Sequence, residues 1–166
     1  SRVRASGPSY EDDYTNETGY YEIFGLEAGN YMVTAYPPYG TNLLSNSTTA
    51  SVMLGEKTTV NLILHEAGKI VGRVTDANGT EIYNVYVEVY PGWSYDYAND
   101  TGYYEIIGLE AGNYTVTAYP PYGTNLLSNS TTATVNLGET TIVDFVLRTP
   151  PDIWIYPMDF NVTLLQ

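Results

Sequence analysis

The chain has 166 residues, of which 19 are Asp or Glu and only 6 are Lys or Arg, so its formal net charge at pH 7 is −13. A surface this negative repels phosphate backbones and anionic lipid head groups, which argues against nucleic acid and membrane surfaces as partners. The composition, with 18 Tyr, 15 Gly and 9 Pro, favours strands joined by turns over helices. No apolar run reaches the length of a membrane span, so we expect no membrane insertion.

A long internal repeat organises the sequence. Residues 16–54 return as residues 99–137, and only five of the 39 positions differ. The differing pairs are Glu17/Asp100, Phe24/Ile107, Met32/Thr115, Ser51/Thr134 and Met53/Asn136. The repeat predicts one domain over residues 1–66, a second over residues 67–148, and a separate C-terminal segment over residues 149–166.

The first predicted strand lies within Ser1–Gly7, and its register is ambiguous. Matching Pro8 to Pro91 points Arg2 and Arg4 inward, whereas a slip of one residue points Val3, Ala5 and Gly7 inward. We therefore expect a bulge or a register shift in this strand.

The following segments alternate apolar and polar residues with a period of two, which is typical of strands with one buried face. The expected inward residues of the first repeat are Tyr21, Ile23, Leu26, Tyr31, Val33, Ala35, Val52, Leu54, Val60, Leu62 and Leu64. Those of the second are Ile70, Gly72, Val74, Val85, Val87, Val89, Tyr104, Ile106, Leu109, Tyr114, Val116, Ala118, Val135, Leu137, Val143, Phe145 and Leu147. The pattern predicts an all-β fold of two tandem β-sandwiches.

A family resemblance adds to this prediction. It rests on Thr101–Ile106, Gly108-Leu109, Ala111–Tyr114 with Val116, the preceding Gly72–Asp76 and Val85–Val87, and the later Gly138–Thr140 and Val143–Leu147. These residues resemble the carboxypeptidase regulatory-like family, a transthyretin-like and Cna-B-like sandwich, over nearly all of residues 68–148. The resemblance implies an Ig-like or transthyretin-like fold, common in spacers and adhesive modules of surface proteins. Some Cna-B relatives form a Lys–Asn or Lys–Asp isopeptide bond, but Lys69 and Asp144 should both point outward, so we expect no such bond.

The first repeat lacks a counterpart of the strand-like segment Lys69–Thr75. We expect its domain to have an open core and an unpaired sheet edge that accepts a strand from another chain. The spare segment Asp159–Gln166 is suited to that role, since Phe160, Val162 and Leu164 form one apolar face. The stretch before it contains Ile153, Trp154, Ile155 and Tyr156, which we expect to line the joint between subunits.

These features predict a head-to-tail homopolymer built by donor-strand complementation: the C-terminal strand of one subunit completes the first domain of the next. Two alternatives stay open. In a longer repeat array, the missing strand would precede Ser1 and the tail would begin another module. The tail could also fold back onto its own first domain.

Seven N-x-S/T sequons occur where chance predicts roughly two. They begin at Asn16, Asn46, Asn78, Asn99, Asn113, Asn129 and Asn161. We expect N-glycosylation at several of them, and hence an extracellular or cell-surface location. The alternative is that Asn, Ser and Thr are simply turn residues.

The residues of most catalytic centres are missing. His65 is the single histidine and cysteine is absent, which removes His/Cys metal sites and His-dependent triads. Carboxylates at Glu11–Asp13, Asp76–Glu81 and Asp96 with Asp100 lack the spacing of a calcium loop. We therefore expect no enzyme activity, no metal and no cofactor other than covalent glycans. The second function class is a carbohydrate-binding or adhesive module, for which the repeated aromatic loops Tyr36–Tyr39 and Tyr119–Tyr122 are candidates.

Overall fold

The protein is described by a computed structural model over residues 1–151. That part of the chain contains strands and no helix, which confirms the all-β prediction; it accordingly holds no helix able to cross a membrane. The strands are β1 (Arg2–Ser6), β2 (Tyr10–Tyr14), β3 (Gly29–Tyr36), β4 (Asn46–Val52), β5 (Gly68–Asp76), β6 (Tyr86–Tyr90), β7 (Tyr95–Tyr97), β8 (Tyr103–Leu109), β9 (Gly112–Tyr119), β10 (Asn129–Val135), β11 (Thr140–Ile142) and β12 (Phe145–Leu147).

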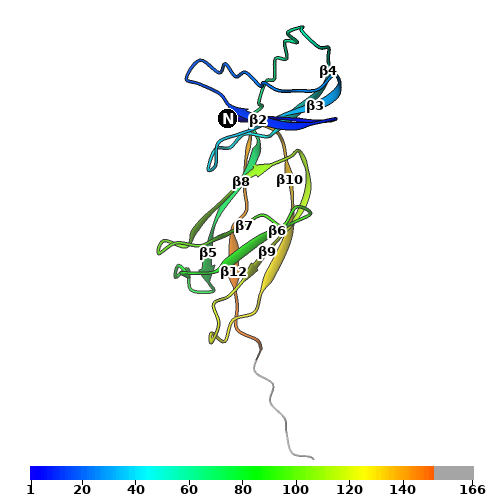
Figure 1. Cartoon of the computed structure of the whole chain (residues 1–166). Helices are drawn as coiled ribbons and strands as arrows, with labels where there is room; N and C mark the ends of the chain where they lie inside the picture. The colour runs from blue at the N-terminus through cyan, green and yellow to red at the C-terminus, as the bar shows by residue number, and fades with distance from the viewer. Residues whose placement is uncertain (152–166) are drawn as a thin grey trace, which may run out of the picture.

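Residues 67–148, here called the C-terminal unit, form two packed sheets (Figure 1). One sheet has the strand order β10-β9-β6-β7, and the other has the order β11-β5-β12, with β8 also paired to β5. The alternating apolar residues meet between the sheets, where Ile70, Val87, Tyr104 and Leu147 are completely buried. Period-2 patterning therefore places the core between the sheets.

β5 is the strand on which the second sheet of this unit depends. It pairs antiparallel with β8 on one side and parallel with β11 and then β12 on the other. None of β8, β11 and β12 pairs with another of the three. β5 is thus a central strand, not an edge, and removing it would leave its three partners without backbone partners in that sheet.

Residues 1–66, here called the N-terminal unit, contain a single sheet of order β2-β1-β3-β4. This sheet matches β7-β6-β9-β10 strand for strand, but the counterparts of β8, β11 and β12 are not strands. The prediction of strands at Tyr21–Leu26 and Val60–Leu64 was therefore wrong. The expectation of an unpaired sheet edge was also wrong, since the β5 position is central and the described residues place no strand there.

The β1 register resolves the ambiguity of Ser1–Gly7. Val3 and Ala5 are buried, while the Arg2 side chain pairs with Asp12 at 2.9 Å. Val3 pairs with Asp13, whereas Val87 of the second repeat pairs with Asp96. The β1–β2 turn is therefore one residue longer, and this extra residue allows the slip that buries Val3 and Ala5; Gly7 lies exposed in that turn.

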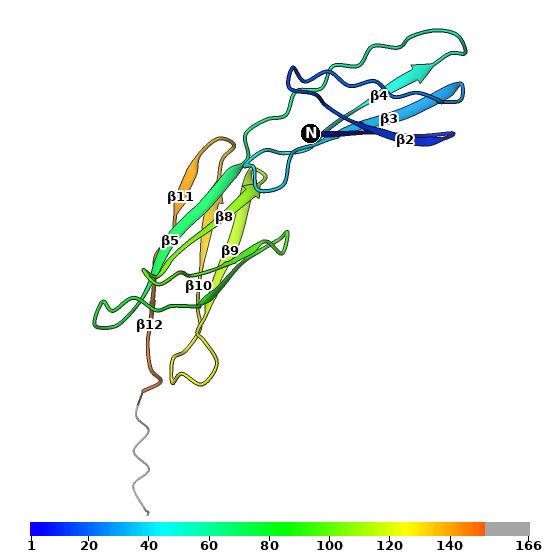
Figure 2. The same ribbon diagram turned by 60° about the vertical axis from the view of Figure 1, so that its left-hand side comes forward.

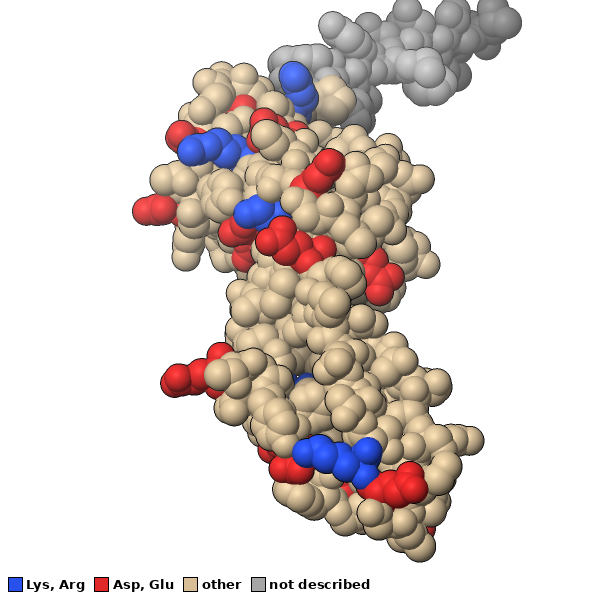
Figure 3. Space-filling model, turned by 90° about the horizontal axis from the view of Figure 1, so that it is seen from above, with Lys and Arg blue, Asp and Glu red and all other residues tan. Residues whose placement is uncertain are grey.

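The two units sit end to end, and the strands of the N-terminal unit are inclined to the long axis of the other (Figure 2). β5 begins beside the N-terminal unit and runs away from it (Figure 2). Acidic side chains are scattered along the molecule rather than gathered in one patch on the face seen in Figure 3.

Candidate assembly site: an open groove in the N-terminal unit

A groove of about 540 Å³ opens in the N-terminal unit where β5 lies in the C-terminal unit. Residues 19–26 form one wall and residues 52–61 form the other, and Ala5, Tyr31 and Val33 lie at its floor. In the second repeat, the counterpart of the first wall is β8, and the counterpart of the second wall is the turn between β10 and β11 together with β11 itself. The groove is therefore the vacant track of a central strand.

The groove walls keep contacts that the complete C-terminal unit also makes. Tyr21 donates its hydroxyl to the Val60 carbonyl at 2.8 Å, as Tyr104 does to Val143 at 2.7 Å. Two further contacts are repeated in the same way, and in the first of them Asp13 Oδ2 accepts from the Glu22 backbone N–H at 2.8 Å.

In the C-terminal unit, Asp96 accepts from the Glu105 backbone N–H at the same distance, 2.8 Å. Asn46 also donates to the Ile63 carbonyl at 2.9 Å, as Asn129 does to Val146 at 3.4 Å. Side chains thus hold the walls in place without the strand between them, which reduces the ordering cost of inserting one.

The open groove leaves apolar side chains partly exposed. Tyr104, Ile106 and Leu147 are buried, whereas their counterparts Tyr21, Ile23 and Leu64 are only half-buried. Burial still raises the pKa of Tyr21 above its ordinary value, as it does for Tyr104. Covering this surface is favourable by about 25 cal/mol per Å² of apolar area, so the groove favours an apolar occupant.

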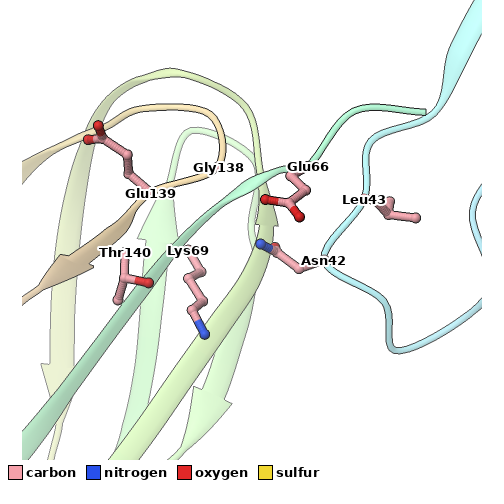
Figure 4. A pocket seen from close by; sticks show the side chains of 7 residues that line it. All are labelled: Asn42, Leu43, Glu66, Lys69, Gly138, Glu139 and Thr140. Carbon is pink, nitrogen blue, oxygen red and sulfur yellow. The ribbon is translucent and has the colours of Figure 1, made fainter. Parts of the chain in front are cut away.

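A second pocket, of about 350 Å³, lies at the joint between the two units (Figure 4). Asn42 projects from the β3–β4 loop toward the linker beside Glu66 (Figure 4). Its Oδ1 accepts from the Gly108 backbone N–H at 2.9 Å, and its Nδ2 donates to the Ala67 carbonyl at 2.7 Å. No motif in the sequence marks Asn42 as a joint residue, although its loop, residues 37–47, recurs unchanged as residues 120–130.

The predicted sequons within the described residues lie on loops and strand ends. Asn16, Asn78, Asn99, Asn113 and Asn129 are exposed, and Asn46 is half-buried. Asn16 and Asn99 accept hydrogen bonds through Oδ1, which leaves Nδ2, the atom that carries an N-glycan, directed away from those contacts. At Asn16 and Asn99, Nδ2 thus makes none of these hydrogen bonds, whereas Nδ2 of Asn46 and of Asn129 donates to the Ile63 and Val146 carbonyls.

The remaining predicted assembly residues lie outside the described residues. They are Ile153, Trp154, Ile155, Tyr156, Phe160, Val162 and Leu164, together with the sequon at Asn161. Their roles stay predictions.

Among the carboxylates that could ligate calcium, Asp76 is engaged by backbone N–H groups of its own turn. Asp76 accepts from the backbone N–H groups of Thr80 and Asn78, which holds its pKa below the ordinary value. Within residues 1–151, no three His, Cys, Asp or Glu side chains gather closely enough to hold a metal ion.

The residues considered for an isopeptide bond have other partners. Lys69 Nζ lies 2.7 Å from Glu105 Oε1, which raises the pKa of Lys69. Asp144 Oδ1 instead accepts from the Arg73 backbone N–H at 2.8 Å. Lys69 and Asp144 therefore engage different groups on the outer face of the sheet.

The comparisons with known proteins agree with the resemblance read from the sequence. Residues 69–148 match the carboxypeptidase regulatory-like domain family. No curated protein matches the sequence.

Three solved structures show a distant similarity to this chain. The TIE protein of Bacillus anthracis is 14% identical, with a TM-score of 0.44, over 89% of this chain and 32% of its own. GBS52, the minor pilin of Streptococcus agalactiae, is 15% identical, with a TM-score of 0.44, over 90% of this chain and 72% of its own. A streptococcal ancillary pilin is 18% identical, with a TM-score of 0.41, over 76% of this chain and 44% of its own. The chain thus spans about a third of the length of the TIE protein.

Proposed function

We propose that this protein, whose second repeat is a carboxypeptidase regulatory-like domain, is a non-enzymatic subunit of an extracellular, N-glycosylated, pilus-like fibre. Copies join head to tail when the C-terminal segment of one copy enters the groove of the next. The domains are those read from the sequence: a strand acceptor over residues 1–66, a complete sandwich over residues 67–148, and a donor segment over residues 149–166. The observation that carries the proposal is the vacant β5 track between walls already held in place.

The donor segment has the chemistry that the groove requires. Phe160, Val162 and Leu164 supply an alternating apolar face, and β5 presents Ile70 and Val74 inward in the same way. Residues 149–158, fully extended, span roughly 33 Å, which is enough to leave one copy and reach another. Because donor and acceptor are different surfaces, repetition gives an open fibre unless the rotation closes a ring.

Deletion of residues 159–166 tests the proposal. The intact protein should form filaments visible by negative-stain electron microscopy, and the deletion variant should sediment as a monomer. A synthetic peptide of residues 159–166 should bind the deletion variant, whereas the same peptide with Val162→Asp should not. Filaments from the deletion variant, or a monomeric intact protein at high concentration, would contradict strand donation.

The same experiment separates the other sources of a strand. If sequence preceding residue 1 in a longer natural protein fills the groove, that longer protein will not bind the peptide. If the tail folds back onto its own chain, the intact protein will be monomeric and equally unable to bind the peptide.

A second candidate function, carbohydrate binding, is favoured by a tyrosine cluster on the outer face of β6, β7 and β9. The Tyr86 ring lies 5.2 Å from Tyr95, 5.3 Å from Tyr97 and 6.0 Å from Tyr119. Glu88 accepts hydrogen bonds from the hydroxyls of Tyr86 and Tyr119, each at 3.1 Å. Exposed aromatic faces beside a carboxylate suit sugar rings, and glycan-array binding by the isolated monomer would favour this function.

A further inference from the structure

The direction of β5 determines where a donated strand enters the groove. β5 runs antiparallel to β8 and parallel to β11 and β12. A strand with the same partners in the N-terminal unit must therefore run antiparallel to residues 20–26 and enter at the end that corresponds to Gly68. The Gly68 backbone pairs with Leu109, and a side chain there would meet Val135 and the Asn136 carbonyl.

The corresponding end of the N-terminal unit carries three exposed apolar side chains, here called the mouth. Phe24 is 72% exposed, Met53 is 59% exposed and Leu54 is 80% exposed, and all three line the groove. The same end of the C-terminal unit is covered by the joint, where Gly108 is bonded to Asn42 and Gly138 donates to the Ala67 carbonyl at 3.3 Å. Among the described residues, nothing covers the mouth.

The repeats differ at this end in an informative way. Of the five differences, two lie here: Phe24 replaces Ile107, and Met53 replaces Asn136. Asn136 donates to Glu139 Oε2 at 2.9 Å within the exposed turn between β10 and β11, a bond that methionine cannot make. The mouth is therefore more apolar than the same end of the second repeat, because Met53 replaces a polar side chain and Phe24 keeps an apolar one.

We propose that Phe24, Met53 and Leu54 bind the Ile153–Tyr156 segment of a second copy, which lies two residues before the donated strand. This inference rests on the proposed function. A strand that enters at the mouth brings the residues before it across these three side chains, and in this chain those residues are Ile, Trp, Ile and Tyr. The apolar segment and the apolar mouth thus match in chemistry.

The double substitution F24I/M53N tests the mouth, because each new residue is the one that the second repeat carries at the same place. Filaments should still form, since residues 159–166 are intact, but they should dissociate at least about tenfold faster after dilution, as followed by light scattering. The control Met32→Gln removes an exposed methionine on β3, which does not line the groove, and should leave the rate unchanged. Thermal unfolding of both variants checks that they fold.

A coupling measurement identifies the partner segment. Trp154→Ala should accelerate dissociation in the wild-type background and add little in F24I/M53N, because residues in contact are not additive. The mouth assignment would be overturned if the effects of Trp154→Ala and F24I/M53N on the dissociation rate were additive. It would also be overturned if F24I/M53N filaments dissociated at the wild-type rate. Either result would leave strand donation intact. If the deletion of residues 159–166 does not abolish filaments, strand donation fails instead.

Discussion

Replacing Asn42 by Ala should weaken the joint between the two units, and the change should be measurable at the Gly108 backbone amide. The Asn42 side chain makes two hydrogen bonds across the joint, accepting from the Gly108 N–H at 2.9 Å and donating to the Ala67 carbonyl at 2.7 Å. A typical hydrogen bond contributes about 0.5–1.5 kcal/mol net, so the joint should lose about 1–3 kcal/mol. The Gly108 amide loses one of these bonds, and its hydrogen exchange should accelerate roughly two- to twelvefold, since about 1.4 kcal/mol corresponds to a factor of ten.

The repeat supplies a matched control for this measurement. Asn125 occupies the same position in an identical loop, and the loop has the same shape, because Thr41 and Thr124 each donate to a proline carbonyl, at 2.7 and 2.8 Å. Asn125 is exposed and lies at the end of the C-terminal unit remote from the joint. Amide exchange followed by NMR should therefore show no change at Gly108 in Asn125→Ala. Unchanged exchange in Asn42→Ala, or equal acceleration in both variants, would refute the assignment of the joint to Asn42.

Three further measurements test other parts of the structure. Gly72→Ala should destabilise the C-terminal unit by about 2 kcal/mol or more in urea unfolding, because a Cβ there overlaps a backbone carbonyl oxygen. Gly112→Ala, whose Cβ would meet only the Tyr114 ring at 3.8 Å, should cost far less. Backbone hydrogen bonds from Thr80 and Asn78 hold the pKa of Asp76 in the folded protein below its ordinary value of 3.8. The stability that these bonds add is therefore present above pH 3.8 and is lost as the pH falls through the pKa of Asp76 in the folded state. Unfolding curves between pH 5 and pH 2 should show this loss, and Asp76→Asn should flatten it. Met32→Thr creates a sequon at the exposed Asn30, and in a glycosylating host the intact mass should rise by one glycan; an unchanged mass would count against glycosylation of this face.

The alternation of side chains predicted most of the C-terminal unit. Val85, Val87 and Val89 read as one buried face, and all three are completely buried. This works because the period-2 geometry of a strand is local: each side chain's direction follows from its own backbone. The family resemblance over residues 68–148 is likewise confirmed by the match over residues 69–148.

The order of strands in a sheet depends on pairing between distant segments, and the sequence alone did not predict it. The repeat aligned residues 16–54 with residues 99–137, but only the tertiary structure placed β5 between β8 on one side and β11 and β12 on the other. An absent edge strand leaves a sheet intact, whereas an absent central strand leaves Tyr21–Leu26 and Val60–Leu64 without backbone partners, although their sequences still alternate.

The sequence by itself determined that this chain is all-β, twice repeated, acidic and rich in sequons, because composition and periodicity are properties of neighbouring residues. Only the tertiary structure decided the register of β1, the contacts of Asn42 and the vacant track in the N-terminal unit. Each of these depends on which distant segments meet, and the pairing of distant segments is decided by the packing of the whole fold.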